Sequence, residues 1–89
     1  MTTTAIAAVV FRKRNIVRGE VVSVASTRRP WVRTDVELRD PTGTLVLRFF
    51  GRSSIPGLVC GRQIVAQGTP SLVNDAIVMI NPFYSFAEV

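Results

Sequence analysis

The stretch DPTGTLVLRFF, from Asp40 to Phe50, decides how this 89-residue chain folds. Its first four letters, DPTG, are typical of a tight turn with proline in the second position. The residues after the turn alternate, so that one phase holds Leu45, Leu47 and Phe49 and the other holds Val46, Arg48 and Phe50. A period of two predicts a β-strand with the leucine phase in the core and the arginine phase outside.

The residues before the turn alternate in the same way. The run from Trp31 to Asp40 predicts a strand with one wet face. Its inward phase consists of Val32, Thr34, Val36 and Leu38. Its outward phase consists of Trp31, Arg33, Asp35, Glu37 and Arg39. We therefore expect the outward faces of these two strands to lie side by side and to carry both arginines and aromatic rings.

Three more runs, residues 16–25, 62–69 and 76–81, predict three more strands. In the first run the phase changes near Val21, which indicates a β-bulge, and Gly19 indicates a sharp bend. A long, bent first strand can pair with both halves of a sheet, as a small closed barrel requires. The segment TPSLVND, residues 69–75, is predicted to turn the chain.

Five strands with a pause after the third predict an all-β fold, a five-stranded Greek-key barrel of the OB type. The connector, Ser53 to Gly61, has room for one short helical turn at most, because Pro56 and Gly57 interrupt it. An SH3-like barrel also has five strands, but the pause in this chain falls where the OB-fold places its helix.

We expect an N-terminal arm or short helix over residues 1–15, the barrel over residues 16–86 and a tail over residues 87–89. For the N-terminal segment, three structures remain open: a helix that is capped by Thr4, an added strand and a frayed arm. Its apolar run, Ala5 to Phe11, is too short to span a bilayer, and its positive charges follow the run, which is the reverse of a secretory signal. No membrane partner is expected.

The composition favours a polyanionic partner. The chain has 11 Lys and Arg against 6 Asp and Glu, and ten of the eleven cations are arginine. A net charge of +5 on a small domain attracts polyanions through long-range electrostatics and counterion release. The chain lacks histidine for acid–base chemistry, a Gly-rich phosphate loop with a lysine, and paired carboxylates. We therefore expect neither an enzyme nor a cofactor.

The single cysteine, Cys60, limits the redox and metal chemistry of the chain. One cysteine forms no disulfide within the chain, which fits a cytoplasmic location. A structural zinc site needs four Cys or His ligands, so no metal is expected. Cys60 lies in the apolar turn LVCGR and is predicted to be a small buried hydrophobe.

The ordered segments VRGEVVSV, VELRDPTGTLVLRFFGRSSIPGL and GRQIVAQGTPSLVNDAIVMINPFY resemble small actinobacterial-type OB-fold proteins that bind nucleic acid. A glycine in strand one, D-x-T-G before strand three, an aromatic pair and a late N-P are also similar to the wedge domain of RecG-type branched-DNA helicases. The resemblance covers Ile16 to Phe86. It implies a nucleic-acid ligand, with DNA favoured over RNA, and a protein that acts alone, as a homo-oligomer or on a larger DNA-processing machine. The helicase domains are missing, so no ATP-driven activity carries over.

The candidate binding residues lie on the face of strands two and three and on the adjoining loops. OB-folds bind oligonucleotides there: arginines follow phosphates, and aromatic rings stack on bases with little sequence preference. The candidates for binding single-stranded or branched DNA are Arg28, Arg29, Trp31, Arg33, Arg39, Arg48, Phe50 and Arg52. Arg28 and Arg29 have no acid near them in sequence, whereas Arg33 and Arg39 are also able to pair with Asp35 or Glu37.

A second hypothesis is a protein–protein interaction or oligomerisation module without significant affinity for nucleic acid. Trp31 and Phe50, together with the aromatic tail of Phe83, Tyr84 and Phe86, favour it, because exposed rings are typical of protein contacts. The dependence of binding on salt separates the two hypotheses, since contacts with phosphates weaken steeply as salt rises.

Overall fold

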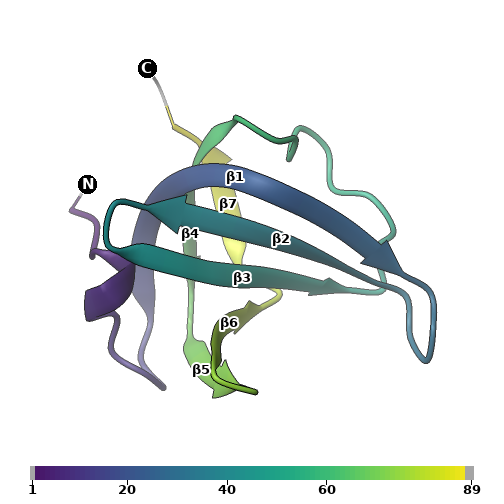
Figure 1. Ribbon diagram of the computed structural model, residues 1–89, viewed down its shortest axis with the longest axis horizontal. Helices are drawn as coiled ribbons and strands as arrows, with labels where there is room; N and C mark the ends of the chain where they lie inside the picture. The colour runs from purple at the N-terminus through teal and green to yellow at the C-terminus, as the bar shows by residue number, and fades with distance from the viewer. Residues whose placement is uncertain (1, 88–89) are drawn as a thin grey trace.

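The computed structural model describes residues 2–87, and within them the chain forms one curled sheet with almost no helix (Figure 1). The strands are β1 (Asn15–Thr27), β2 (Arg33–Asp40), β3 (Gly43–Phe50), β4 (Gln63–Gly68), β5 (Pro70–Val73), β6 (Ala76–Ile80) and β7 (Phe83–Phe86). Their order across the sheet is β5-β6-β3-β2-β1-β4-β7. All neighbours are antiparallel except β3 and β6, which are parallel. The prediction of an all-β fold is confirmed.

The prediction of a closed barrel of five strands is wrong as stated, because the described residues form seven strands in a sheet that ends at β5 and β7. The segment predicted to turn contains β5, and the turn itself is only Asn74 and Asp75. Both residues have positive φ, 49° and 64°, as a two-residue hairpin turn requires. The aromatic tail adds β7 beside β4. Runs of four residues are too short for the period of two to identify them.

The curl of the sheet follows from the chain connection between β4 and β5. These strands lie far apart in the strand order, yet only Thr69 separates them in the chain. With one residue between them, the facing ends of these strands lie no more than about 7 Å apart, so the two parts of the sheet must come together at this point. Strand β4 pairs with β1 and strand β5 pairs with β6, so Thr69 joins the two parts of the sheet.

The long first strand is as predicted. The first half of β1 pairs with β4 and the second half pairs with β2. The register shifts between Val21 and Ser23, which is the predicted bulge. A Cβ on Gly19 would lie 2.6 Å from the carbonyl oxygen of Arg39, so only glycine allows β2 to approach this closely.

The core lies on the inner side of the curl. The predicted inward phases of β2 and β3 are buried, and β1, β4 and the connector add further apolar side chains. The turn η1 (Ile6–Ala8) is a 3-10 turn, so the N-terminal helix capped by Thr4 is not found: Ala5 precedes the turn and makes no side-chain cap bond. Ile6 is fully buried in the core. The prediction for Cys60 is wrong, because its side chain is exposed.

Residues 88 and 89 of the predicted tail lie outside the described residues. Ala87 belongs to the sheet edge, because its N–H donates to the carbonyl of Gln63 at 3.0 Å. Just before it, Phe86 packs on the connector: its ring fills the space where a Cβ on Gly57 would stand, and the guanidinium of Arg62 lies 4.0 Å from the ring centre. The C-terminal strand therefore holds the connector against the sheet.

Candidate nucleic-acid interface

The loop between β1 and β2, residues 28–32, extends past the end of β3 and carries three candidate residues (Figure 1). Arg28 and Arg29 are exposed, and 71% of Trp31 is exposed. Arg33 pairs with both Thr27 and Phe50, so the loop lies beyond the ends of all three strands and its side chains stand clear of the core. We call this region, together with Arg52, the hairpin end.

Arg52 belongs to the hairpin end because the segment after β3 is bonded to β2. The N–H of Gly51 donates to the carbonyl of Val32 at 2.7 Å, and the hydroxyl of Thr34 donates to the carbonyl of Arg52 at 2.7 Å. The backbone of Arg52 is therefore fixed beside the loop while its side chain remains exposed. Two segments that are separated in sequence thus bring three arginines and a tryptophan to one end of the sheet.

A groove of about 410 Å³ lies beside the hairpin end and has aromatic walls. It is lined by Phe49, Phe50, Arg52, Asn81, Pro82, Phe83 and Tyr84. Phe50 stands opposite Arg33 in the register of β2 and β3, and the side-chain oxygen of Asn81 accepts the N–H of Phe50 at 3.0 Å. The exposed fractions are 38% for Phe50 and 73% for Phe83. Exposed rings next to an arginine form a surface that suits unpaired bases.

Two candidate arginines on the face of β2 and β3, Arg33 and Arg48, are paired with one carboxylate, that of Asp35. Arg48 makes two hydrogen bonds with Asp35, Nε to Oδ1 at 3.0 Å and Nη2 to Oδ2 at 3.3 Å, and only 17% of its side chain is exposed. Arg33 approaches the same carboxylate at 3.5 Å. The mostly covered guanidinium of Arg48 is therefore paired with Asp35 and is not free to bind a phosphate. The charge of Arg33 is partly neutralised by the same carboxylate.

The hairpin end has a different charge balance. Within residues 2–87, Arg28, Arg29 and Arg52 make no ion pair with a carboxylate. Three positive charges therefore remain uncompensated around Trp31. A phosphate chain is the kind of ligand that such charges attract, because its binding releases condensed counterions.

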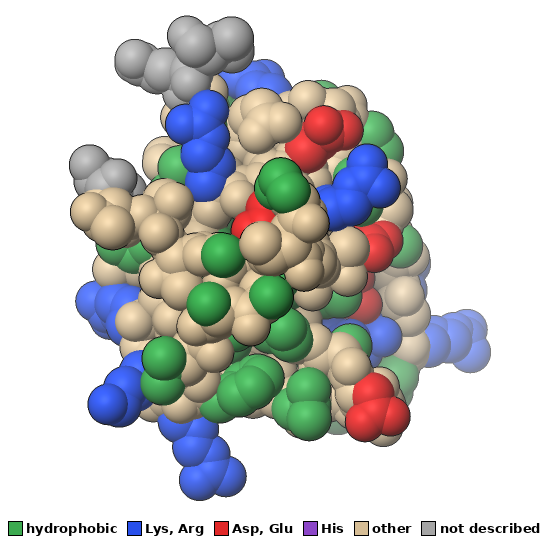
Figure 2. All heavy atoms as spheres, turned by 60° about the vertical axis from the view of Figure 1, so that its left-hand side comes forward, with side chains coloured by type: hydrophobic (Ala, Val, Ile, Leu, Met, Phe, Trp, Pro, Cys, Tyr) green, Lys and Arg blue, Asp and Glu red, His purple; other side chains and the backbone are tan. Residues whose placement is uncertain are grey.

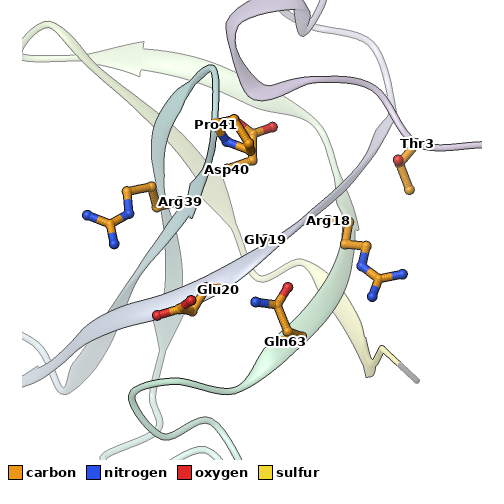
Figure 3. Close-up of a pocket in the computed structure, with 8 residues that line it drawn as sticks. All are labelled: Thr3, Arg18, Gly19, Glu20, Arg39, Asp40, Pro41 and Gln63. Atoms are coloured by element: carbon orange, nitrogen blue, oxygen red, sulfur yellow. The ribbon is translucent and has the colours of Figure 1, made fainter. Parts of the chain in front are cut away.

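Arg39 lies at the opposite end of β2, away from the other candidates. It lines a wide groove of about 700 Å³ with Thr3, Arg18, Gly19, Glu20, Asp40, Pro41 and Gln63. Figure 3 shows that Arg39 and Arg18 point to opposite sides, with Glu20 and Gln63 between them. The arrangement does not direct two cations at one ligand, so the structure separates Arg39 from the hairpin end.

Asp40, in the same region, is fixed by hydrogen bonds. Oδ1 accepts the backbone N–H and the hydroxyl of Thr42 and the N–H of Gly43, and Oδ2 accepts the N–H of Ile6 at 2.9 Å. Burial alone would raise the pKa of Asp40, but these hydrogen bonds stabilise the carboxylate more, so its pKa lies below the usual value. Asp40 thus joins the N-terminal turn to the β2–β3 turn.

Phe83 is a binding candidate that the sequence does not identify. Its position in an aromatic tail suggests protein contacts. In the structure it begins β7 and lines the same groove as Phe50 and Arg52. The sequence INPF indicates that Phe83 is exposed, because Pro82 follows the end of a strand. It does not indicate which surface the ring of Phe83 joins.

No protein-family model matches the chain, and comparisons with curated proteins and with solved structures find no match. The resemblance to OB-fold and RecG wedge proteins stays a prediction. In the described part of the chain, no helix is long and apolar enough to cross a membrane.

Proposed function

We propose that this protein is a nucleic-acid-binding module that binds single-stranded or branched DNA, with little sequence preference, through the hairpin end. The observation that carries the proposal is the grouping of three uncompensated arginines around the exposed ring of Trp31, next to the groove that contains Phe50 and Phe83. Arginines contact phosphates, and each ring that stacks on a base contributes about 1–3 kcal/mol of binding free energy.

The connection of the strands supports a fold of the OB type. If β4 and β5 are counted as one strand bent at Thr69, and β7 is set apart as an addition, five strands remain. In that count the first strand pairs with the second and the fourth, and the third pairs with the fifth in parallel. The OB-fold is a partly open five-stranded barrel that binds oligonucleotides on strands two and three, which here adjoin the hairpin end.

Single strands suit this surface better than duplexes. Rings such as Trp31 and Phe83 need unpaired base faces, and a regular duplex keeps its bases stacked inside. The structure has no helix of a length that would enter a major groove, since η1 has three residues within the described chain. At a branch point, unpaired bases and closely spaced phosphates occur together, so a branched DNA offers the same chemistry.

Fluorescence anisotropy with a labelled single-stranded oligonucleotide tests the proposal. We expect binding at low salt that weakens steeply as salt rises. Replacing Arg28 and Arg29 together by alanine should lower the slope of log affinity against log salt by about 1.4, or about 0.7 for each lost phosphate contact. Arg39→Ala is the matched control, because it removes an exposed arginine from the far end of the same strand pair.

Two results would contradict the proposal. One is an absence of binding at low salt by the folded wild-type protein. The other is an equal loss of slope per arginine in Arg39→Ala and in the double variant, because this would indicate diffuse attraction to the net charge and no site at the hairpin end.

A second candidate function is a protein-interaction module, which a different part of the surface favours. Figure 2 shows hydrophobic side chains gathered on the lower part of one face, with Lys and Arg side chains at its rim. The exposed large hydrophobic residues include Val10, Phe11 and Leu72. The N–H of Arg12 donates to the carbonyl of Pro70, which fixes the segment after Phe11 beside β5. Substituting Phe11 and Leu72 by serine should leave DNA binding unchanged.

A further inference from the structure

The second half of β1 has an outer edge without charge. Residues 21–27, VVSVAST, contain no charged side chain, although the chain carries a net charge of +5. Residues 23–27 are all exposed, and 40% of Val24 is exposed. On one side this half pairs with β2, while the pairing with β4 on the other side ends at Glu20.

Among the described residues, the backbone along this edge has no hydrogen-bonded partner beyond Val21. The N–H of Val21 donates to the carbonyl of Arg62, and its carbonyl accepts the N–H of Gly61. The backbone groups of an antiparallel strand point alternately to its two sides, and the bulge at Val22 adds one residue. The N–H and C=O groups of Val24 and Ser26 therefore point away from β2. In residues 2–87, no backbone group bonds to them from that side.

The nearby connector does not occupy these backbone groups. It reaches Ser26 only through the side chain, whose hydroxyl donates to the carbonyl of Ser53 and shares a hydrogen bond with the hydroxyl of Thr34. Thr34 is buried and lies opposite Ser26 in the register, so both side chains point to the inner face. The connector thus runs beside this half of β1 from Ser26 to Val21, and within residues 2–87 it makes no backbone hydrogen bond to Val24 or Ser26.

The other two edges of the sheet are protected in ways that this edge is not. Strand β5 has four residues and begins with Pro70, and β7 has four residues and follows Pro82. Short edge strands, prolines and charges are the usual means by which proteins prevent unwanted strand pairing. The edge of β1 has a run of consecutive exposed residues with neither proline nor charge, which is typical of a strand that has a partner.

We propose that a second copy of this chain pairs with this edge, antiparallel, to form a symmetric dimer with its two-fold axis at Ala25. Val24 of each copy then faces Ser26 of the other, and the two pairs exchange four backbone hydrogen bonds. Ala25 faces itself across the axis as a non-hydrogen-bonded pair, where Cα atoms come within about 4.5 Å. Alanine is small enough for this close approach, and the pairing covers Val24.

The charge distribution favours a second copy as the occupant. Two chains of charge +5 repel each other, and this edge is a place where they meet without opposing arginines. In the proposed register Ser23 faces Thr27 of the other copy, so only small, uncharged side chains come together. The five paired residues per copy, 23–27, form less than a standard interface, so the dimer is expected to be weak. The inference is independent of whether the hairpin end binds nucleic acid.

Disulfide trapping tests the register. Cys60 is exposed, so Cys60→Ala is the background. Ala25→Cys in that background should form a covalent dimer under mild oxidation, because the Cα separation on the axis lies within the range of about 4.4–6.8 Å for disulfides. Ser23→Cys is the matched control: it is equally on the exposed edge, but its two copies would lie about 13 Å apart along the strands, so it should stay monomeric. Equal trapping of both variants, or of neither, would overturn the proposal.

Analytical ultracentrifugation of the unmodified chain is the second test. The mass should rise from 9.8 kDa toward twice that value as concentration increases. Ala25→Lys should abolish this rise by placing two charges on the axis, while Thr44→Lys, at an exposed position of β3, should keep it. Circular dichroism checks that both variants fold. A monomeric wild-type chain at every concentration, or a dimer that persists in Ala25→Lys, would contradict the inference.

Discussion

At the Asp40 end of the sheet one carboxylate accepts four hydrogen bonds, whereas at the hairpin end three arginines have no carboxylate partner within the described chain. The first arrangement satisfies polar groups internally and joins the N-terminal turn to the β2–β3 turn. The second leaves charge and a large ring in contact with solvent. The comparison teaches that polar residues at the two ends of β2 serve two purposes: stability at one end and, as we propose, ligand binding at the other.

The largest effect should come from the Asp40 end. Gly19→Val places a Cβ 2.6 Å from the carbonyl oxygen of Arg39 and 2.9 Å from Leu38, so β1 and β2 must separate. We expect a loss of about 3 kcal/mol in the free energy of unfolding, from overpacking. Urea denaturation measures it. Gly43→Ala is the control, because its Cβ would meet nothing closer than 3.7 Å. Equal stability of Gly19→Val and wild type would show that the close approach of the strands is not required.

The next effect concerns Asp40 itself. Asp40→Asn keeps the side-chain shape but puts an amide N–H against one of the donors, Ile6 or Thr42. We expect a loss of about 2 kcal/mol in the free energy of unfolding if the part-buried N–H of Ile6 is the donor left without an acceptor, and a smaller loss for the exposed Thr42. Affinity for DNA should not change. A loss of affinity without a loss of stability would reverse the roles that we assign to the two ends.

The same carboxylate predicts a dependence on pH. The folded-state pKa of Asp40 is lowered, so the unfolded chain takes up a proton first as pH falls. The stabilisation is fully present above the ordinary aspartate pKa of about 4 and is lost as pH falls through the folded value. Melting curves between neutral and acidic pH should show a steeper acid loss in wild type than in Asp40→Asn. Parallel curves would contradict the assignment.

A smaller effect distinguishes two arginines near the hairpin end. Arg48→Ala removes the bidentate partner of Asp35 from a mostly covered position, and we expect a loss of about 1 kcal/mol in the free energy of unfolding. Arg52→Ala removes an exposed side chain and should leave stability unchanged while weakening DNA binding. If Arg48→Ala weakens binding more than Arg52→Ala and leaves stability intact, the ion pair with Asp35 opens when ligand binds.

The sequence predicts the parts of the fold in which apolar and polar residues alternate over a long stretch. The phases of β2 and β3, the bulge after Val21 and the need for Gly19 all follow from local patterns. Strands β5 and β7 do not, because four residues show no clear period and their pairing depends on distant partners. The exposure of Cys60 also depends on how the connector packs.

The candidate site is predictable in part for the same reason. Residues on the β1–β2 loop are close in sequence, so the grouping of Arg28, Arg29 and Trp31 follows from their positions along the chain. The choice of Asp35 as partner of Arg48 depends on the cross-strand register, and the arrival of Phe83 beside Phe50 depends on the curl of the sheet. Long-range placement of this kind requires the fold.

Trp31 fluorescence tests the central claim most directly, because it is the only tryptophan in the chain and lies at the hairpin end. Adding single-stranded DNA at low salt should quench its emission as the ring stacks on a base, and added salt should restore the emission. Trp31→Phe should keep most of the affinity and Trp31→Ala should lose about 1–3 kcal/mol of binding free energy. An emission that stays constant while anisotropy shows saturable binding would place the DNA elsewhere on the protein and contradict this account.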